Sequence, residues 1–278
     1  MNSLRFIPRN ALLAVGTAAI LSLTVAAQAD EGWIVDFEKA KAQAAKEGKS
    51  ILMEFTGSDW CPPCKALTAN VLSKDVFKTE MPKSFVLLKL DSPRDKSKQT
   101  PEEIEQYKVL SAKYGIQGVP TIFLADAKGR PYYETVGYSG DPADKYVANL
   151  KEQLGTLAKR DAAFAKAEKA SGAEKAKLLA EGLSLVDDEM ALKTYGDVVS
   201  EIIELDANNK AGLKASYVGF QRAAEVAAGL QQLRTDNPAA KPEVMAGKIG
   251  DFIKAEKLTG ESLQQALFMQ SGILFQAK

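Results

Sequence analysis

The sequence contains no histidine, and only two of its 278 residues are cysteines. Without histidine the chain has no Ser-His-Asp or Cys-His catalytic arrangement, no His-ligated zinc or copper site and no imidazole proton shuttle. Two cysteines are too few for a four-thiolate metal cluster or a disulfide-rich scaffold. Thiol or redox chemistry must therefore use Cys61 and Cys64, and we expect neither a metal nor a cofactor.

An excess of charge of one sign is also missing. Thirty-six basic and 36 acidic side chains give a formal net charge of zero. This balance does not indicate a strongly basic nucleic-acid surface, so we expect no nucleic-acid partner. The composition, 46% hydrophobic and 26% charged, is typical of a soluble globular chain, and its length favours about two domains.

The first 29 residues have the pattern of a cleaved secretory signal. Arg5 and Arg9 precede an uncharged stretch over residues 11–27, and Ala27-Gln28-Ala29 forms a small-residue cleavage site before the first acidic residue. The alternative is an uncleaved membrane anchor, which small and polar residues within this short stretch disfavour. We expect cleavage after Ala29 and a periplasmic or secreted mature protein.

Residues 30–159 are expected to form one domain, because helical patterns alternate there with short apolar runs. The runs at 51–56 and 85–90 are typical of buried strands, and those at 121–125 and 132–136 of a hairpin turning at 126–129. Helices are expected before Gly48, after the capping box that begins at Thr100, and after Asp141. Strands separated by helices and closed by a hairpin and a helix predict a small α/β sandwich.

Residues 160–278 are expected to form a second, all-α domain. Nine of the eleven prolines lie at or before Pro142, and apolar residues then recur at helical spacing, which predicts about five helices of about 12 to 25 residues. The pattern favours antiparallel helical hairpins. Residues 195–213 faintly resemble a tetratricopeptide-type hairpin, although no clear period of about 34 residues is found. The breaks are expected at 171–172, 187–188, 208–209, 238–242 and 259–260.

Cys61-Pro62-Pro63-Cys64 follows the first strand and opens a helix. A cysteine at a helix N-terminus faces unpaired N–H groups and the positive end of the dipole, which favour the thiolate and lower the thiol pKa. Two intervening residues place the second sulfur within one turn, where it can attack a mixed disulfide formed by the first. We therefore expect Cys61 to be the nucleophile and Cys64 to resolve the mixed disulfide.

A single C-x-x-C motif also has other interpretations. The motif could be half of a zinc site, but the chain offers no two further cysteine or histidine ligands. It could be a copper-handling pair, but such pairs typically recruit histidine, which the chain lacks. A purely structural disulfide stays open, although closing a two-residue loop constrains the unfolded chain little.

Two motifs in this order give the chain a family resemblance. Residues 53–65 read MEFTGSDWCPPCK, and residues 113–121 read KYGIQGVPT. Over about residues 33–157 the chain resembles the thioredoxin superfamily, and most of all its extracytoplasmic branch, which includes the C-terminal domain of periplasmic thiol:disulfide interchange reductases. The resemblance implies a thioredoxin-like fold and a redox-active disulfide between Cys61 and Cys64.

The resemblance also implies roles for five further residues. Trp60 matches the tryptophan before the redox pair, and Pro120 the cis-proline beside it; the backbone of Val119 would pair with an extended substrate segment. Glu54 matches the buried acid beneath the resolving cysteine, and Lys89 its partner lysine. A buried carboxyl has a raised pKa and can accept the proton of Cys64. The alternatives are a solvent-facing Glu54 on an edge strand and a plain surface position for Lys89.

Two departures from the family pattern concern the surroundings of the cysteines. One extra residue lies between Glu54 and Cys61 relative to cytoplasmic thioredoxins, which makes the reach of the acid less certain. The segment at residues 92–106 is longer than the usual connection. It either shapes substrate access or is an exposed loop leading into the capped helix.

The resulting prediction is a secreted thiol-disulfide oxidoreductase that exchanges disulfides with protein substrates. Strong oxidants of the family have histidine inside the C-x-x-C, and proline stands there instead, so we favour a reductant. In an oxidising compartment a reductant requires a membrane or periplasmic thiol protein as electron donor. The alternative is a protein-binding adaptor in which the helical domain binds a partner, or mediates dimerisation, and the thioredoxin fold is a docking module.

Overall fold

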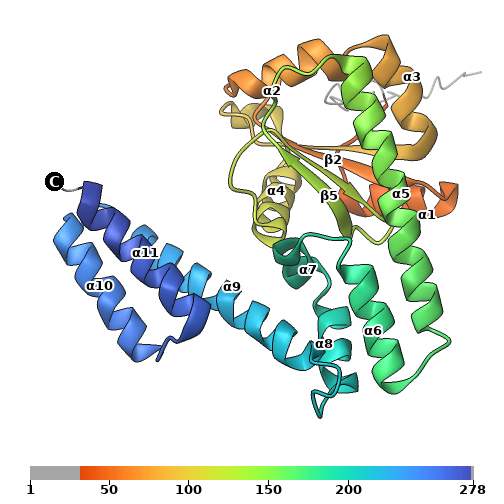
Figure 1. The fold of residues 1–278 in the computed structure, drawn as a ribbon. Helices are drawn as coiled ribbons and strands as arrows, with labels where there is room; N and C mark the ends of the chain where they lie inside the picture. The colour runs from red at the N-terminus through yellow and green to blue at the C-terminus, as the bar shows by residue number, and fades with distance from the viewer. Residues whose placement is uncertain (1–31, 277–278) are drawn as a thin grey trace, which may run out of the picture.

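The computed structural model describes residues 32–276, and its first part is built around a five-stranded mixed sheet (Figure 1). The strand order is β1-β3-β2-β4-β5. The first three strands of this order are parallel, whereas β4 is antiparallel to β2, and β5 to β4. The strands are β1 (Trp33–Ile34), β2 (Ser50–Thr56), β3 (Phe85–Asp91), β4 (Thr121–Ala125) and β5 (Pro131–Val136). The predicted α/β sandwich with its closing hairpin is confirmed.

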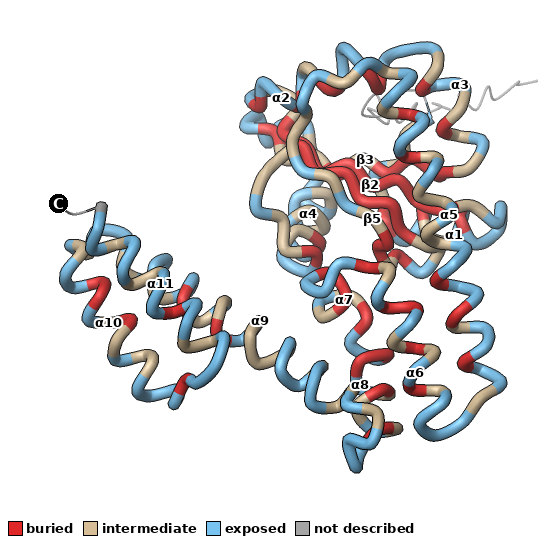
Figure 2. Tube along the Cα trace, in the orientation of Figure 1, coloured by how far each residue is buried: buried red, intermediate tan, exposed pale blue. Residues whose placement is uncertain are grey.

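Helices cover both faces of this sheet. Those on one face are α1 (Phe37–Glu47) and α4 (Pro101–Tyr114), and those on the other are α2 (Pro62–Leu67), its π-helical continuation η1 (Thr68–Leu72), α3 (Asp75–Ser84) and α5 (Ala143–Ala167). All seven residues of β2 are buried in consequence (Figure 2). Successive side chains of a strand point to opposite faces, so Phe55 packs edge-on against Tyr107 and Tyr114 of α4, whereas Glu54 points to the other face.

The expected helix boundaries are confirmed where local chemistry determines them. Gly48 ends α1 in the left-handed conformation, with φ of 65°. Thr100 and Glu103 form the capping box of α4, each side chain accepting the backbone N–H of the other residue. Two elements were missed: β1 has only two residues, and α3 contains Pro82 within its last turn. A two-residue strand has no readable alternation, and an internal proline argues against a helix in the sequence.

The remaining chain is helical, as predicted, but has six helices after α5 among the described residues rather than about five. They are α6 (Gly172–Leu183), α7 (Asp188–Thr194), α8 (Gly196–Leu205), α9 (Leu213–Asp236), α10 (Pro242–Ala255) and α11 (Gly260–Gln276). The additional one is α7, a short helix whose Asp187 side chain accepts backbone N–H groups of its first turn. It is separated from α8 only by Tyr195, which explains why the sequence did not distinguish them.

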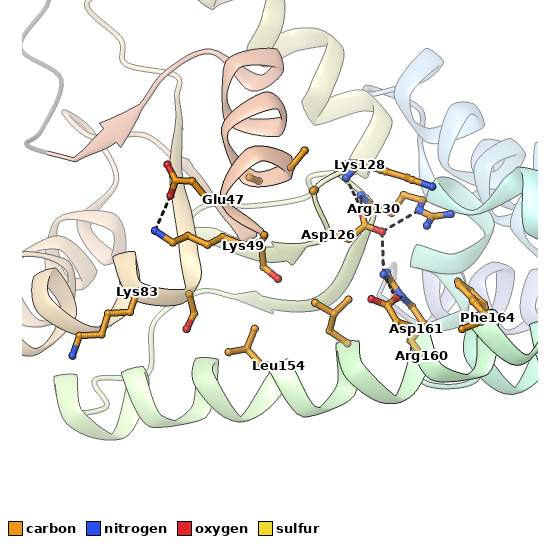
Figure 3. Close-up of a pocket in the computed structure, with 18 of the residues that line it drawn as sticks. Glu47, Lys49, Lys83, Asp126, Lys128, Arg130, Leu154, Arg160, Asp161 and Phe164 are labelled. Carbon is orange, nitrogen blue, oxygen red and sulfur yellow. Dashed lines mark hydrogen bonds and ion pairs between the residues drawn. The ribbon is translucent and has the colours of Figure 1, made fainter.

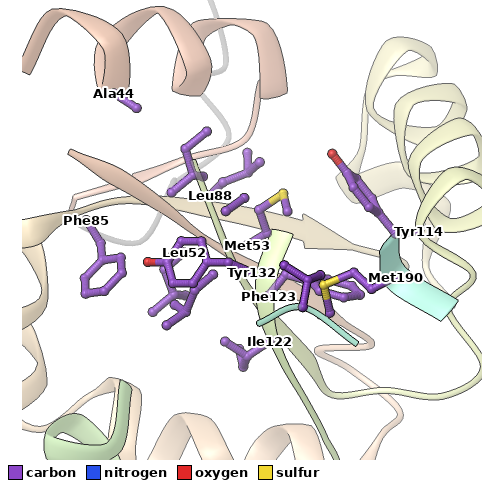
Figure 4. Close-up of a cluster of buried hydrophobic side chains, with 14 of the residues drawn as sticks. Ala44, Leu52, Met53, Phe85, Leu88, Tyr114, Ile122, Phe123, Tyr132 and Met190 are labelled. Atoms are coloured by element: carbon purple, nitrogen blue, oxygen red, sulfur yellow. The ribbon is translucent and has the colours of Figure 1, made fainter. Parts of the chain in front are cut away.

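Buried apolar side chains form two clusters. The first includes the sheet, its helices and the inner faces of α6 to α8; Figure 4 shows Met190 of α7 beside Phe123 and Tyr114. The second lies among α9, α10 and α11, which project from the rest in Figure 1. The predicted domain boundary at residue 159 falls inside α5, which is continuous there. The division into domains stays a prediction.

Arg160 of α5 links the sandwich to the helices, although only 1% of it is exposed. Its guanidinium forms an ion pair with Asp126, after β4, at 3.0 Å and donates a hydrogen bond to the hydroxyl of Tyr195 at 2.5 Å. That hydroxyl in turn donates to the carbonyl of Pro131 at 2.7 Å. Burial raises the pKa of Tyr195 to about 12, so the hydroxyl keeps its proton at neutral pH.

Arg160 also lines a cleft of about 700 Å³ between α1, the β4–β5 turn and α5 (Figure 3). Lys49 and Lys83 line its other end. These residues lie at the amino-terminal ends of β2 and β3, whereas Cys61 follows the carboxyl end of β2. This cleft is therefore separate from the cysteine pair.

Residues 32–276 contain no helix with the length and apolarity that a bilayer crossing requires. The predicted signal sequence, with cleavage after Ala29, lies outside the described residues.

Tyr195→Phe should lower the free energy of unfolding by about 1–3 kcal/mol, because it leaves the buried Arg160 guanidinium and the Pro131 carbonyl each one hydrogen bond short. Urea denaturation measures this. The matched control is Tyr133→Phe, which removes a more accessible hydroxyl bonded to Asn149 at 3.0 Å and should change stability by less than about 0.5 kcal/mol. Equal losses in the two variants would contradict the linking role of Tyr195.

Candidate active site

Cys61 and Cys64 form a disulfide between the end of β2 and the start of α2, with a Cα–Cα separation of 5.3 Å. Cys61 is the N-cap of α2, and its Sγ accepts the backbone N–H of Cys64 at 3.2 Å. Pro62 and Pro63 have no N–H, so the amide of Cys64 is the first backbone donor that the helix can offer this sulfur. The sequence-based placement of Cys61 at a helix N-terminus is confirmed.

A tight turn connects β2 to Cys61. The amides of Trp60 and Cys61 both donate to the carbonyl of Gly57, at 3.2 and 2.9 Å. The indole of Trp60 folds back over Gly57, where a Cβ would lie 2.4 Å from the ring carbon Cε2. Only glycine accommodates the ring in this position. We call residues 57–64 the redox loop.

Val119 and Pro120 lie directly beside the disulfide. The peptide bond between them is cis, as the resemblance predicted. The carbonyl oxygen of Val119 is 3.4 Å from Sγ of Cys61, and the carbonyl of Pro120 accepts the amide of Gly137 at 2.7 Å. Backbone from the start of β4 and the end of β5 is therefore held against the redox pair.

Glu54 lies on the central strand and is 2% exposed, so the alternative of a solvent-facing residue on an edge strand is wrong. It is in register with Lys89 of β3, which places both residues on the same face of the sheet. Both line a cavity of about 480 Å³ with Thr68, Leu72 and Phe77 of the helices that follow Cys64. The acid and the lysine are thus brought together on the face that α2 covers, and their roles stay predictions.

The segment at residues 92–99 packs against the redox loop, which the sequence left undecided. Its Ser92 carbonyl accepts the indole N–H of Trp60 at 2.8 Å. The carboxylate of Asp59 accepts the amides of Arg94 and Asp95, at 2.9 and 3.1 Å. The amide of Arg94 holds the pKa of Asp59 below its usual value. We call residues 92–99 the bracing segment.

The side chain of Trp60 is therefore held in one position by the bracing segment, which the motif alone does not indicate. The residue is 39% exposed, and the guanidinium carbon of Arg94 lies 5.7 Å from the ring centroid. Asp91, at the end of β3, also holds the redox loop, because its carboxylate accepts hydrogen bonds from both the amide and the hydroxyl of Ser58. Sequence reasoning missed Asp59, Asp91 and Arg94; the only signal for them was the unusual length of the segment after β3.

Comparisons with known proteins match the part of the chain that contains this site. A family model described as a thioredoxin-like domain matches residues 37–154. The chain is 27% identical over 118 residues to "Disulfide bond reductase DsbH" of Chlamydia pneumoniae, covering 42% of this chain and 70% of that protein. It is 24% identical over 135 residues to "Thioredoxin-related protein DsbJ" of the same organism, covering 49% of this chain and 37% of that protein.

Solved structures that match part of the chain include "DsbH Oxidoreductase", with a TM-score of 0.43 and 24% identity, covering 52% of this chain and 95% of that one. Another is the oxidised C-terminal domain of DsbD from Neisseria meningitidis, with a TM-score of 0.32 and 20% identity, covering 43% and 97%. From the family match and the relative DsbH, residues 37–154 are a thioredoxin-superfamily domain, and with its C-x-x-C pair the protein is a thiol-disulfide oxidoreductase.

In the reduced protein, Cys61 should react with iodoacetamide at least about ten times faster than Cys64 at pH 7, because the Cys64 amide stabilises the thiolate of Cys61 and the thiolate is the reactive form. Mass spectrometry of the digested protein after timed alkylation measures the two rates. Single Cys61→Ser and Cys64→Ser variants assign them. Equal rates, or faster alkylation of Cys64, would show that the attacking sulfur has been assigned wrongly.

Proposed function

We propose that the protein reduces disulfide bonds in protein substrates outside the cytoplasm, using Cys61 as nucleophile and Cys64 as resolving residue. The observation that carries this proposal is the position of the disulfide, at a helix start and 3.4 Å from the backbone of Val119. Two prolines between the cysteines, and the name of the relative DsbH as a disulfide bond reductase, support the reducing direction.

The reaction consists of two thiol-disulfide exchanges. The Cys61 thiolate attacks one sulfur of the substrate disulfide, forms a mixed disulfide and releases the other substrate sulfur as a thiolate. The Cys64 thiolate then attacks Sγ of Cys61, which closes the Cys61–Cys64 disulfide and releases the second substrate thiolate. Two electrons pass to the substrate, and its two thiolates take up the protons lost by the two cysteines.

The backbone beside the disulfide is the proposed substrate-binding edge. Val119 and Pro120 directly precede β4. An extended substrate segment would pair with the backbone of Val119 as an added strand. Trp60 borders the same sulfur from the redox loop. This arrangement recognises main chain rather than a particular side chain, and so suits a set of protein substrates.

Glu54 and Lys89 are proposed to move the proton of Cys64. That thiol must lose its proton before it can attack the mixed disulfide, and a buried carboxylate on the same face of the sheet can accept it. Lys89, in register with Glu54, would stabilise the carboxylate in its ionised form.

Continued turnover needs a second thiol protein that returns two electrons to the Cys61–Cys64 disulfide. We propose a membrane or periplasmic dithiol protein, because the predicted signal sequence places the enzyme in an oxidising compartment. The donor would use the same edge beside Val119 as the substrates, since both reactions pass through a mixed disulfide with Cys61.

Cys61→Ala and Cys64→Ala should each abolish dithiothreitol-coupled reduction of insulin, because the first removes the nucleophile and the second prevents its release. Insulin precipitation measures the activity, with the wild-type protein as reference. An active Cys61→Ala protein would contradict the mechanism. The reduction potential of the pair tests the direction: a value near that of strong oxidants, about −120 mV, would contradict the reductant role.

Glu54→Gln should slow decay of the mixed disulfide by about ten-fold or more, since the substitution removes the base but keeps the shape. Single-turnover kinetics with a chromogenic disulfide separate attack by Cys61, expected to be unchanged, from release by Cys64. Lys89→Gln should slow the same step by a smaller factor. Unchanged release in Glu54→Gln would exclude the proton-accepting role, and loss of attack alone would indicate a structural effect.

A further inference from the structure

The bracing segment fixes one cation beside Trp60, the residue before the nucleophile. Arg94 is exposed, yet its main chain is held by the bond from its amide to the Asp59 carboxylate at 2.9 Å, and the next amide bonds the same carboxylate at 3.1 Å. The neighbouring Ser92 carbonyl holds the indole of Trp60 at 2.8 Å. Main-chain hydrogen bonds before and after Arg94 thus fix the position of its Cα atom relative to Trp60.

The carboxylates around this cation are already used by other groups. Both oxygens of Asp59 accept main-chain amides, and both oxygens of Asp91 accept bonds from Ser58. Asp95 accepts the amide and hydroxyl of Ser97 and lies 3.8 Å from the ammonium of Lys98. Arg94 itself forms no ion pair with any residue in the range 32–276.

The guanidinium of Arg94 instead lies over the Trp60 ring, 5.7 Å from its centroid. A guanidinium over an aromatic face can still direct N–H groups away from the ring, where a carboxylate can accept them. Lys65 and Lys96 add positive charge nearby, since their ammonium groups bond the Asp59 carbonyl and the Ser92 hydroxyl. These three cations lie around the redox loop and the bracing segment, together with the carboxylates of Asp59, Asp91 and Asp95.

A partnerless surface arginine is usually only solvated. Arg94 differs because its main chain is fixed and because the ring beneath it belongs to the residue next to the nucleophile. Any substrate segment in contact with Cys61 and the exposed part of Trp60 passes this guanidinium.

We propose that Arg94 and Trp60 form an anion-selective edge of the substrate site, so that the enzyme prefers disulfides whose cysteine is flanked by an acidic side chain. The carboxylate of the substrate would bind the free edge of the guanidinium while the cystine reaches Cys61. Arg94 is thus a specificity-determining residue. This inference rests on the proposed reductase function.

The test compares two synthetic peptide disulfides that differ only in Glu or Lys next to the cysteine. The quantity measured is the ratio of kcat/KM for the Glu peptide to that for the Lys peptide, in wild type and in Arg94→Gln. Intrinsic differences in reactivity between the peptides cancel in this comparison. We expect Arg94→Gln to lower the ratio about three- to five-fold at low salt, the effect of one exposed charge pair, and the wild-type ratio to fall as salt is added.

Two variants serve as controls. Arg94→Lys keeps the charge but loses the planar group, and should retain part of the preference. Lys96→Gln removes one charge from the same segment without touching Trp60, and should lower the ratio less than Arg94→Gln does.

The outcomes separate this inference from the function on which it rests. Wild-type protein that reduces neither peptide contradicts the proposed reductase activity. Wild-type protein that reduces both, with a ratio that Arg94→Gln leaves unchanged, overturns only the role of Arg94. An equal fall in Lys96→Gln would also overturn it, because the preference would then arise from general charge rather than from the guanidinium over Trp60.

Discussion

The site depends on one constraint, the burial of β2 on both faces and along both edges. A strand between β3 and β4 with helices above and below cannot shift its register without exposing Phe55 or moving Glu54 to the other face. The redox loop, which follows the carboxyl end of β2, therefore has a fixed position relative to the sheet. The antiparallel neighbour β4 starts at that same end, which is why Val119 and Pro120 lie beside Cys61 although 58 residues separate Val119 from that cysteine.

The parts predictable from sequence were those set by local chemistry. Gly48, the Thr100 capping box and the short apolar runs of the strands are short-range signals, and the structure follows them. The bracing segment was not predictable, because Asp59 bonds main-chain amides 35 and 36 residues away. Many side chains with an acceptor oxygen can accept a main-chain N–H, so these contacts leave no residue pattern. The burial of Glu54 was predictable only through the resemblance, since the strand order is a long-range property.

The helices that follow the sandwich are held to it by polar contacts as well as apolar ones. Arg160 and Tyr195 are among the largest fully buried side chains, and their bonds reach Asp126 and Pro131 at the turn between β4 and β5. That turn lies at the end of the sheet away from Cys61. The helical part therefore joins the sandwich without covering the redox pair, while α11 presents Phe268 and Phe275, 83% and 82% exposed, at the far end of the chain.

The two prolines of the motif connect the geometry to the proposed direction of electron flow. A dithiol is a strong oxidant when its reduced form is stabilised, because the protein then gains by accepting electrons. Stabilising the reduced form means stabilising the thiolate of Cys61 with donors or positive charge. Here Pro62 and Pro63 remove two amides and no histidine is available, which leaves the Cys64 amide at 3.2 Å as the donor that the helix supplies. A pair with a modestly stabilised thiolate gives up its electrons more readily, which is the property a reductant requires.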